Sequence, residues 1–423
     1  MWQLVVSIER NGARTSVGKI EGKSSEDAVF SYFDNYINAS DSRAISISLP
    51  LTSEPFSPSQ TRHFFEGLLP EGFLRSSIAS ANHADDADYL RLLELLGSEC
   101  LGAIQICSPD YLDRETGYRE MNDESLQELA QEGAEKSAEL VVRSRLSLTG
   151  ASGKIGVYKS ESGKWFLPLG LAPSTHILKQ SHIRYRQIVQ NEQLCQLTAS
   201  IMGIDTPESS VMIPQTADTT EQMLFVTKRY DRTFEGSNRY ISGLLSPLRL
   251  HQEDFAQALG IASVDKYELS DGQYMKKMFD LLRERSASPI EDQIKLWDII
   301  VFQYLIGNTD GHIKNYSLLY DTVLQTVRLA PAYDLVSTII YRNHTSNMAF
   351  QIGHAKDWYQ LDRTCFEQAA MELGLNQSIL MDRYSELSDR FEKSLQTAAN
   401  QLGDKEHLDF HFIANQILDK HKR

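Results

Sequence analysis

The segment 306–337 constrains the fold and the chemistry of this chain more than any other stretch. The residues before it, 293–306, form an apolar helical pattern that ends at Gly307, a residue type that commonly terminates helices. Two short apolar runs, 316–320 and 326–329, follow the polar residues and predict a hairpin. The segment therefore predicts a helix, a polar loop and a hairpin in succession.

Three oxygen-bearing side chains flank the predicted hairpin: Asp310, Asn315 and Asp334. An Asp and an Asn with four residues between them, followed by a second Asp after the next hairpin, is the arrangement in which protein kinases hold a general base and magnesium. We expect Asp310 to accept the proton of an attacking hydroxyl, and Asn315 and Asp334 to bind magnesium, which prefers hard oxygen ligands. Either aspartate alone is equally consistent with a turn or capping residue. Their combination behind an apolar helix favours catalysis.

The region 141–245 contains what a nucleotide-binding site needs. A turn of small residues, 149–154, lies between apolar strand patterns and would let backbone amides approach phosphates. A later strand pattern ends at Lys179, which would neutralise phosphates, and a helical pattern after it carries Glu192, which would orient the lysine. The alternative for Lys179 is a surface lysine. The turn is neither a Walker loop nor the usual kinase glycine pattern.

Two further groups of residues are candidates for nucleotide contacts. Residues 228–230 follow the last strand pattern of the region, where a hinge would offer backbone groups to adenine. His312 and Lys314 lie in the polar loop and face either solvent or, for His312, a phosphate. No second histidine or cysteine stands at ligand spacing from His312, so a metal-ligand role is disfavoured.

Composition and charge exclude several classes of protein. The 423 residues exceed one hydrophobic core, so we expect two or three domains. A net charge of −15 argues against a protein that grips nucleic acid over its whole surface. Four cysteines without metal-ligand spacing fit a reducing cytoplasm. The first twenty residues lack the apolar run of a signal peptide, and the longest apolar stretch, 296–306, is too short to span a bilayer. We expect a cytoplasmic protein without membrane segments.

Changes in pattern predict three parts. Residues 1–140 begin with short β-rich runs, the last of them at 45–51, and end in a polar, acidic stretch that we interpret as a solvated helix or a linker. Residues 141–245 would form the nucleotide-binding lobe. Residues 246–423 are mainly helical and contain the catalytic segment.

The order of these motifs resembles one family, the HipA-type serine/threonine kinase toxins of bacterial type II toxin–antitoxin modules, over nearly the whole chain. The most specific piece is Gly307-Asn308-Thr309-Asp310-Gly311-His312-Ile313-Lys314-Asn315. The other matching pieces are Phe64-Phe65-Glu66-Gly67-Leu68-Leu69-Pro70, Ser147-Leu148-Thr149-Gly150-Ala151, Thr175-His176-Ile177-Leu178-Lys179, Arg229-Tyr230-Asp231-Arg232 and Gln252-Glu253-Asp254.

The resemblance implies an α+β, two-lobed, protein-kinase-like fold with an added N-terminal β-rich subdomain and a mainly helical C-lobe. It implies that Asp310 is the catalytic base and that Asn315 and Asp334 bind Mg²⁺. It implies ATP contacts from Thr149, Gly150, Ala151, Ser152, Gly153, Lys154, Lys179, Lys228, Arg229, Tyr230, His312, Ile313, Lys314, Asn315, Tyr333 and Asp334.

The resemblance also implies partners and a modification. Family members phosphorylate an aminoacyl-tRNA synthetase, usually the glutamyl enzyme, which arrests translation and promotes persistence. A small DNA-binding antitoxin, HipB-like, holds them in check, so operator DNA would be reached only through the antitoxin. A serine that the family autophosphorylates matches Ser147. A phosphate there would repel ATP, so we expect inactivation. Thr149 and Ser152 are rival acceptors, and Ser147 as a simple turn cap is the alternative.

Departures from the family pattern leave alternatives open. The loop continues Ala151-Ser152-Gly153-Lys154 where the best-known members carry Gln-Glu before the lysine, and Lys228 stands where an acidic residue is common. Both departures bear on substrate choice more than on catalysis. One rival is a small-molecule kinase of related fold, which leaves Ser147 and the N-terminal subdomain unexplained. The other is a non-catalytic, antitoxin-binding corepressor, which has no need of Asp310, Asn315, Asp334 and Lys179 together.

Overall fold

A computed structural model describes residues 1–109, 116–132, 134–144, 153–180, 185–215, 217, 222–270, 273–342, 344–406 and 408–422. The chain divides into two compact units, each made of three segments. The first unit comprises Met1–His182, Met212–Ser263 and Leu319–Thr326, and the second comprises Ile183–Val211, Val264–Leu318 and Val327–Arg423. Each unit combines segments from different parts of the sequence, so these units do not test the division at residues 140 and 245, which stays a prediction.

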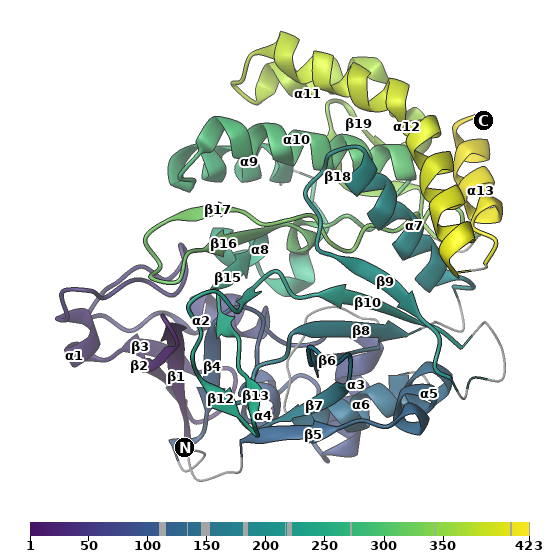
Figure 1. Ribbon diagram of the computed structural model, residues 1–423. Coiled ribbons are helices and arrows are strands. Elements are labelled where there is room, and N and C mark those ends of the chain that lie inside the picture. The colour runs from purple at the N-terminus through teal and green to yellow at the C-terminus, as the bar shows by residue number, and fades with distance from the viewer. Residues whose placement is uncertain are drawn as a thin grey trace. The chain divides into compact units, whose positions relative to one another are not determined.

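The first unit begins with a four-stranded antiparallel sheet in the order β3-β2-β1-β4 (Figure 1). Its strands are β1 (Trp2–Arg10), β2 (Ala13–Gly22), β3 (Val29–Tyr32) and β4 (Ile104–Cys107). Asn11 and Gly12 join β1 to β2, both with positive φ, which is the geometry of a tight type I′ hairpin. The strand expected at 45–51 is absent: that stretch forms only an isolated bridge between Ser46 and Leu49.

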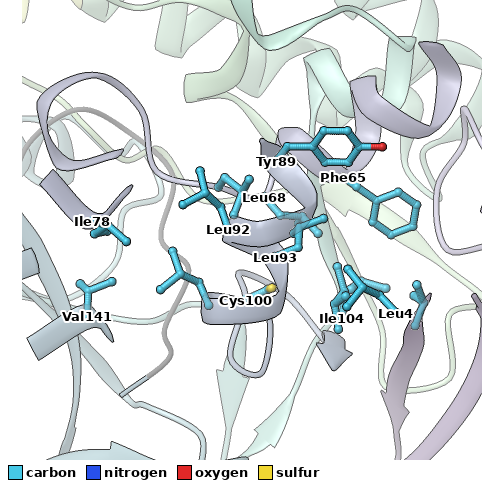
Figure 2. Close-up of a cluster of buried hydrophobic side chains, with 14 of the residues drawn as sticks. Leu4, Phe65, Leu68, Ile78, Tyr89, Leu92, Leu93, Cys100, Ile104 and Val141 are labelled. Atoms are coloured by element: carbon cyan, nitrogen blue, oxygen red, sulfur yellow. The ribbon is translucent and has the colours of Figure 1, made fainter. Parts of the chain in front are cut away.

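Short helices cover this sheet and form a hydrophobic core with it. They are α1 (Asp34–Ile37), α2 (Pro58–Glu66), α3 (Gly72–Ala81) and α4 (Tyr89–Leu96). Figure 2 shows Leu92 and Leu93 of α4 among the apolar side chains of this cluster, which also includes Leu4 and Ile104 from the sheet. Both leucines are fully buried, and burial of such a side chain contributes about 1.5–3 kcal/mol.

A second sheet has six strands in the order β5-β7-β6-β8-β10-β9, and all of them except most of β9 belong to the first unit (Figure 1). The strands are β5 (Gly117–Glu120), β6 (Lys154–Lys159), β7 (Trp165–Leu169), β8 (His176–Gln180), β9 (Ser209–Met212) and β10 (Leu224–Lys228). Two helices, α5 (Asp123–Glu132) and α6 (Ala134–Ser144), occupy the acidic stretch. Residues 123–137 were expected to form a solvated helix or a linker, but Leu126, Leu129 and Ala130 of α5 are buried, so this helix has one buried side.

The first unit is completed by small elements after β10. They are β11 (Arg232–Thr233) paired with β14 (Leu248–Arg249), β12 (Tyr240–Ile241) paired with β13 (Leu244–Leu245), β15 (Gln252–Asp254) and α8 (Phe255–Leu259). The tip of the predicted hairpin also lies in this unit. Asp321 accepts hydrogen bonds from the backbone N–H groups of Val323, Gln325 and Thr326, at 3.0, 2.9 and 3.0 Å, which explains why the chain turns there.

The second unit is mainly helical. Its helices are α7 (Ile188–Ile201), α9 (Tyr274–Arg285), α10 (Pro289–Ile306), α11 (Arg363–Glu372), α12 (Gln377–Glu406) and α13 (His411–His421), with η2 (Ser263–Asp265), η3 (Ile313–Asn315) and η4 (Trp358–Gln360) as short 3₁₀ turns. The long helix α12 packs against α7, α10, α11 and α13 (Figure 1). Most residues of α10 are buried, and Pro289 begins it at a position where proline is well tolerated.

Four short strands complete the chain: β16 (Ser317–Tyr320), β17 (Val327–Leu329), β18 (Asn347–Ile352) and β19 (Ala355–Asp357). The expected hairpin of 316–320 and 326–329 is confirmed by the adjacent strands β16 and β17. Among the described residues, no helix combines the length and the apolar character needed to cross a membrane.

Candidate active site

The loop 307–315, which we call the catalytic loop, leaves the end of α10 at Gly307. This glycine has φ +67°, and its N–H donates to the carbonyl of Gln303. A Cβ at this position would lie 2.3 Å from Cγ2 of Ile339, so both the backbone conformation and the space require glycine. The expected end of the helix at Gly307 is confirmed, and it sets the direction in which the polar residues leave α10.

Thr309 anchors the catalytic loop to the chain that follows Asp334. It is 1% exposed, and its N–H donates to Oγ1 of Thr338 at 2.7 Å. Its own hydroxyl donates to the carbonyl of Thr345 at 3.0 Å and lies 2.8 Å from Oγ1 of Thr338. The residue immediately before Asp310 is therefore held on two sides, which restricts where the aspartate can point.

Asn308 joins the two predicted catalytic segments. Its Oδ1 accepts from the N–H of Asp310 at 3.0 Å, and its Nδ2 donates to the carbonyl of Asp334 at 3.2 Å. Asn315 adds a third bond, because its Nδ2 donates to the carbonyl of Asp310 at 3.1 Å. The structure therefore brings Asp310, Asn315 and Asp334 into one hydrogen-bonded group within the second unit.

Asp334 has an unusual backbone conformation. Its φ is +52°, a region that non-glycine residues seldom occupy and that concentrates at functional sites. The preceding Tyr333 donates its hydroxyl to the carbonyl of Lys314 at 2.9 Å, and Ser317 lies 2.6 Å from the same hydroxyl. Asp334 is thus tied to the catalytic loop through its own carbonyl and through the side chain of the preceding Tyr333.

The chemistry of this group fits magnesium. Asn315 uses its amide nitrogen toward Asp310, which leaves Oδ1 as the atom that a magnesium ion would take, and Asp334 contributes a carboxylate. Both side chains are half-buried. In the part of the chain that is described, no group of three or more His, Cys, Asp or Glu residues could hold a metal without further ligands. Phosphate oxygens and water would complete the coordination.

The carboxylate of Asp310 has a partner that the sequence patterns do not indicate. Oδ1 accepts a hydrogen bond from the hydroxyl of Tyr267 at 2.5 Å. The ring of His312 meets the Tyr267 ring edge-on, with centroids 5.4 Å apart. Tyr267 lies 43 residues before Asp310, outside any motif that we recognised. Asn308, by contrast, stands inside the Gly307–Asn315 motif and was available to sequence reasoning.

The remaining predicted residues of the catalytic loop are well buried. His312 is 7% exposed, Ile313 is fully buried and Lys314 is 4% exposed. The N–H of His312 donates to the carbonyl of Asp310, and the N–H of Asn315 donates to that of His312, both at 2.7 Å. A solvent-facing role for His312 and Lys314 is therefore excluded, and their contact with ATP stays a prediction.

Two lysines predicted to bind phosphates lie opposite each other on neighbouring strands of the six-stranded sheet. Lys154 of β6 and Lys179 of β8 are direct cross-strand partners. They are 7% and 9% exposed, and Nζ of Lys179 lies 5.5 Å from the centre of the Phe225 ring. Residues directly opposite in an antiparallel pair point to the same face of the sheet, and two like charges there favour an anion nearby. Lys179 is thus not an ordinary surface lysine.

Most of the predicted phosphate loop lies outside the described residues: Ser147, Thr149, Gly150, Ala151 and Ser152. Gly153, which follows it, accepts a hydrogen bond at its carbonyl from the N–H of Gln180, at 3.3 Å. A Cβ on Gly153 would come within 1.9 Å of the end of the Gln180 side chain, so a larger residue there would require Gln180 to move.

The predicted hinge residues have three different environments. Lys228 is exposed at the end of β10, and Tyr230 hydrogen-bonds Gln252 through its hydroxyl. The side chain of Arg229 is fully buried, while its backbone N–H donates to the carbonyl of Thr175 at 2.9 Å. Any contact between Arg229 and ATP would therefore have to use its backbone, as the hinge hypothesis requires.

Arg229 belongs to a set of six buried charges in the first unit, which we call the buried ion network. Its members are Glu9, Glu99, Arg229, Asp231, Arg232 and Arg249, each at most 7% exposed. Glu99 is its centre: Oε1 accepts from Arg232 at 2.8 Å and Oε2 accepts from Arg249 at 2.6 Å. Asp231 accepts twice from Arg229, at 2.8 and 2.6 Å.

The network is electrically balanced, with three acids and three arginines. Burial alone would raise the pKa of Glu99, but Arg232, Arg249 and Arg229 together hold that pKa well below its usual range. The same competition lowers the pKa of Asp231. These side chains hold the guanidinium of Arg229 in place, and their charges balance one another.

Glu192 lies in the middle of α7, where the expected helix is confirmed. It is 8% exposed and shares its face with buried Cys195, Ala199 and Met202. Lys179 belongs to the first unit and Glu192 to the second, so the orienting ion pair stays a prediction.

Comparison with known proteins gives matches over nearly the full length. The family model described as the HipA-like C-terminal domain matches residues 146–395, and that of the HipA N-terminal domain matches residues 12–107. A Sinorhizobium fredii protein, Y4mE, whose name describes it as a candidate kinase, is 32% identical over 385 residues, covering 88% of each chain. The serine/threonine-protein kinase toxin HipA of Shewanella oneidensis is 24% identical, over 90% of this chain and 87% of its own length.

A solved structure shares the fold. HipA from the Shewanella oneidensis MR-1 complex of HipA, HipB and operator DNA superimposes with a TM-score of 0.80 at 20% identity, covering 98% of this chain and 96% of that one. The α+β, kinase-like fold with a HipA-type N-terminal part, expected from the sequence, is therefore confirmed.

Proposed function

This chain belongs to the HipA family, and from that premise we propose that it is an ATP-dependent serine/threonine protein kinase. One observation carries the proposal: Asn308 hydrogen-bonds both Asp310 and Asp334, and Asn315 also hydrogen-bonds Asp310. This arrangement supports a base and two magnesium ligands held in a common frame. A protein that only bound an antitoxin would have no use for it, which disfavours the corepressor alternative.

In the proposed reaction, the hydroxyl of a serine or threonine gives its proton to Asp310. The oxygen of this serine or threonine then forms a bond to the γ-phosphorus of ATP, and the bond from that phosphorus to the oxygen of ADP breaks. Lys154 and Lys179 would balance the charge of the phosphates. Mg²⁺ held by Asn315 and Asp334 would neutralise the charge that develops between the phosphates.

Labelled ATP tests the proposal directly. Wild type and Asp310→Asn are incubated with [γ-³²P]ATP, Mg²⁺ and cell lysate, and products are separated into proteins and small molecules. We expect a labelled protein that Asp310→Asn reduces by roughly 10²–10⁴-fold, the usual contribution of a general base. Asp389→Asn, an exposed acid on α12, is the matched control and should transfer phosphate normally. A labelled small product would instead support a small-molecule kinase, and no transfer at all would reject kinase function.

For the partner, the relatives supply the proposal. The Shewanella protein is named a toxin, and its structure includes HipB and operator DNA. We therefore infer that this chain has a HipB-like antitoxin and acts in the cytoplasm. For the substrate, we propose what the resemblance of the motifs implies, an aminoacyl-tRNA synthetase, with the glutamyl enzyme favoured. Phosphorylation of that enzyme would arrest translation and promote persistence. Purified glutamyl-tRNA synthetase offered with labelled ATP should accept label from wild type and not from Asp310→Asn.

Autophosphorylation of Ser147 completes the proposed function. A phosphate adds roughly −1.5 to −2 charges, which would repel ATP from the loop that is expected to hold it. Intact mass and peptide mapping after incubation with ATP should find one phosphate on Ser147 and a loss of transfer activity. Phosphate on Thr149 or Ser152 would move the site, and an unmodified peptide 145–154 would remove it.

A further inference from the structure

We propose that the Tyr267 hydroxyl holds the position beside Asp310 that the hydroxyl of the phosphoryl acceptor takes during the reaction. The segment 264–269 would then form the side of the active site that binds the acceptor. This inference rests on the proposed kinase function. It starts from one contact: the Tyr267 hydroxyl lies 2.5 Å from Oδ1 of Asp310. A general base must be approached by the hydroxyl that it deprotonates to about 2.6–3.2 Å. The tyrosine oxygen lies slightly closer than this range, and it likewise carries a hydroxyl proton.

The backbone around Tyr267 is anchored on both sides. Lys266 accepts a hydrogen bond at its carbonyl from the N–H of Ile313 in the catalytic loop, at 3.4 Å. The backbone N–H of Glu268 donates to the carbonyl of Ala349 at 2.8 Å, and its side-chain carboxylate accepts from the N–H groups of Tyr274 and Gln351, both at 2.6 Å. Because these bonds hold the main chain, an acceptor can reach Oδ1 of Asp310 only when the Tyr267 side chain rotates away.

The Tyr267 side chain is partly exposed. It is 44% exposed, and its ring touches His312 edge-on rather than being enclosed. A hydrogen bond at such an exposed site is weak enough to be exchanged for one from a substrate. The tyrosine is therefore a replaceable partner of the base and not part of the packed core.

The residues beside Tyr267 favour a polypeptide as the acceptor. Val264 is 84% exposed and Leu269 is 58% exposed. Together with Tyr267, they place three large hydrophobic side chains in solvent within six positions. Solvent-facing apolar side chains beside a catalytic group are typical of a surface that binds another chain. A hydroxyl on a protein side chain would displace Tyr267, while the flanking apolar residues contact the polypeptide around it.

The test uses water as the acceptor, so that no protein substrate is needed. In the basal reaction, water gives a proton to Asp310, its oxygen bonds to the γ-phosphorus, and ADP leaves. Steady-state ATP hydrolysis with saturating ATP and Mg²⁺ is measured for the full chain and for Tyr267→Phe, which keeps the ring and removes the hydroxyl. We expect the variant to hydrolyse ATP about 5-fold faster, which corresponds to about 1 kcal/mol, with KM for ATP unchanged.

Two variants control this measurement. Tyr274→Phe removes another hydroxyl of the same unit, one that donates to the carbonyl of Asp265 at 2.5 Å, and should leave the rate unchanged. Tyr267→Leu removes the hydroxyl with a different side chain and should reproduce the increase, so the test does not depend on one variant folding well. Addition of Asp310→Asn to Tyr267→Phe should abolish the gain.

The outcomes separate this inference from the proposed function. An unchanged or slower rate in Tyr267→Phe, alongside hydrolysis by wild type that needs Asp310, overturns the role of Tyr267 and leaves the kinase intact. Absence of ATP turnover and of label transfer in every variant overturns both. An increase in Tyr274→Phe as large as in Tyr267→Phe would show that loosening this region, and not freeing the base, is responsible.

Discussion

The buried ion network of the first unit and the catalytic loop of the second hold their functional backbones in opposite ways. The network uses six ionised side chains that are nearly inaccessible and pair with one another. The catalytic loop uses neutral hydrogen bonds from Asn308, Thr309 and Asn315, while Asp310 and Asp334 remain half-buried. Charges that neutralise each other fix structure, whereas charges meant for a substrate must be positioned without being neutralised.

The difference has an energetic basis. Removing an ion from water costs several kcal/mol, and only close opposite charges offset that cost. Glu99 meets three arginines and keeps its charge in a fully buried place. An arginine paired as closely with Asp310 would lower its basicity and reduce its use as a base.

Breaking the network at Glu99 should have the largest effect on stability. Glu99→Gln leaves three arginines with only two acids, so one buried positive charge is no longer balanced. An uncompensated buried charge lowers the free energy of unfolding by about 3–5 kcal/mol. The free energy of unfolding from urea titration measures this loss. Glu120→Gln is the control: Glu120 and Lys164 are more than half exposed, so their pair contributes about 1 kcal/mol or less. Equal effects of the two variants would contradict the structural role of the network.

Glu253 sharpens the comparison, because it is a buried acid of the first unit bound by uncharged groups. Burial raises its pKa to about 7, although Ser46, at 2.5 Å, and Tyr320 donate hydrogen bonds to it. Its ordinary value is 4.5, so the folded state holds a proton that the unfolded chain releases between these pH values. The resulting stability is complete below pH 4.5 and is lost as pH rises to about 7, by up to about 3 kcal/mol.

The measurement for Glu253 is the difference in unfolding free energy between wild type and Glu253→Gln at several pH values. We expect wild type to lose stability relative to the variant between pH 4.5 and 7, with a constant difference above that range. Burial lowers the pKa of His176 and of His251 to about 4. These two histidines therefore make stability rise with pH, opposite to the effect of Glu253. Both proteins contain these histidines, so the difference isolates Glu253. A difference independent of pH would show that this acid is ionised when buried.

At the start of the catalytic loop, shape rather than charge determines which residue is allowed. Gly307→Ala combines a left-handed backbone with a Cβ 2.3 Å from Ile339. Gly163→Ala has the same type of backbone strain, at φ +82°, with nothing within 4 Å of the added Cβ. We expect Gly307→Ala to be less stable than Gly163→Ala by about 2 kcal/mol, the usual cost of overpacking. Similar melting temperatures for the two variants would mean that Ile339 moves aside at little cost.

The smallest effect is expected at Asn308, and it should appear in activity. Asn308→Ala removes the bonds to both Asp310 and Asp334, each contributing about 1 kcal/mol, and should reduce phosphoryl transfer about tenfold. Asn308→Asp keeps the acceptor for the N–H of Asp310 but loses the donor to Asp334. We expect it to retain transfer activity between those of wild type and Asn308→Ala, at unchanged thermal stability. Full activity of Asn308→Ala would remove Asn308 from the positioning of the base.

Much of the catalytic segment was predictable because its signals are local. A glycine ends α10, and Asp321 caps the turn of the β16–β17 hairpin with its own side chain. The spacing of Asp310 and Asn315 needs only one short loop to bring them together. Two expectations were inaccurate: residues 45–51 form no strand, and the acidic helices are partly buried. In both cases tertiary packing overrode a weak local pattern.

The sequence by itself determined the order of helix, loop and hairpin, the identity of the candidate base and metal ligands, and the family. These depend on residues within a few positions of one another, whose backbone preferences are intrinsic. Only the tertiary structure decided that Glu99 meets Arg249, 150 positions away, and that Tyr267 meets Asp310. Pairs so distant along the chain leave no periodicity or spacing in the sequence, because the packing of whole elements brings them together.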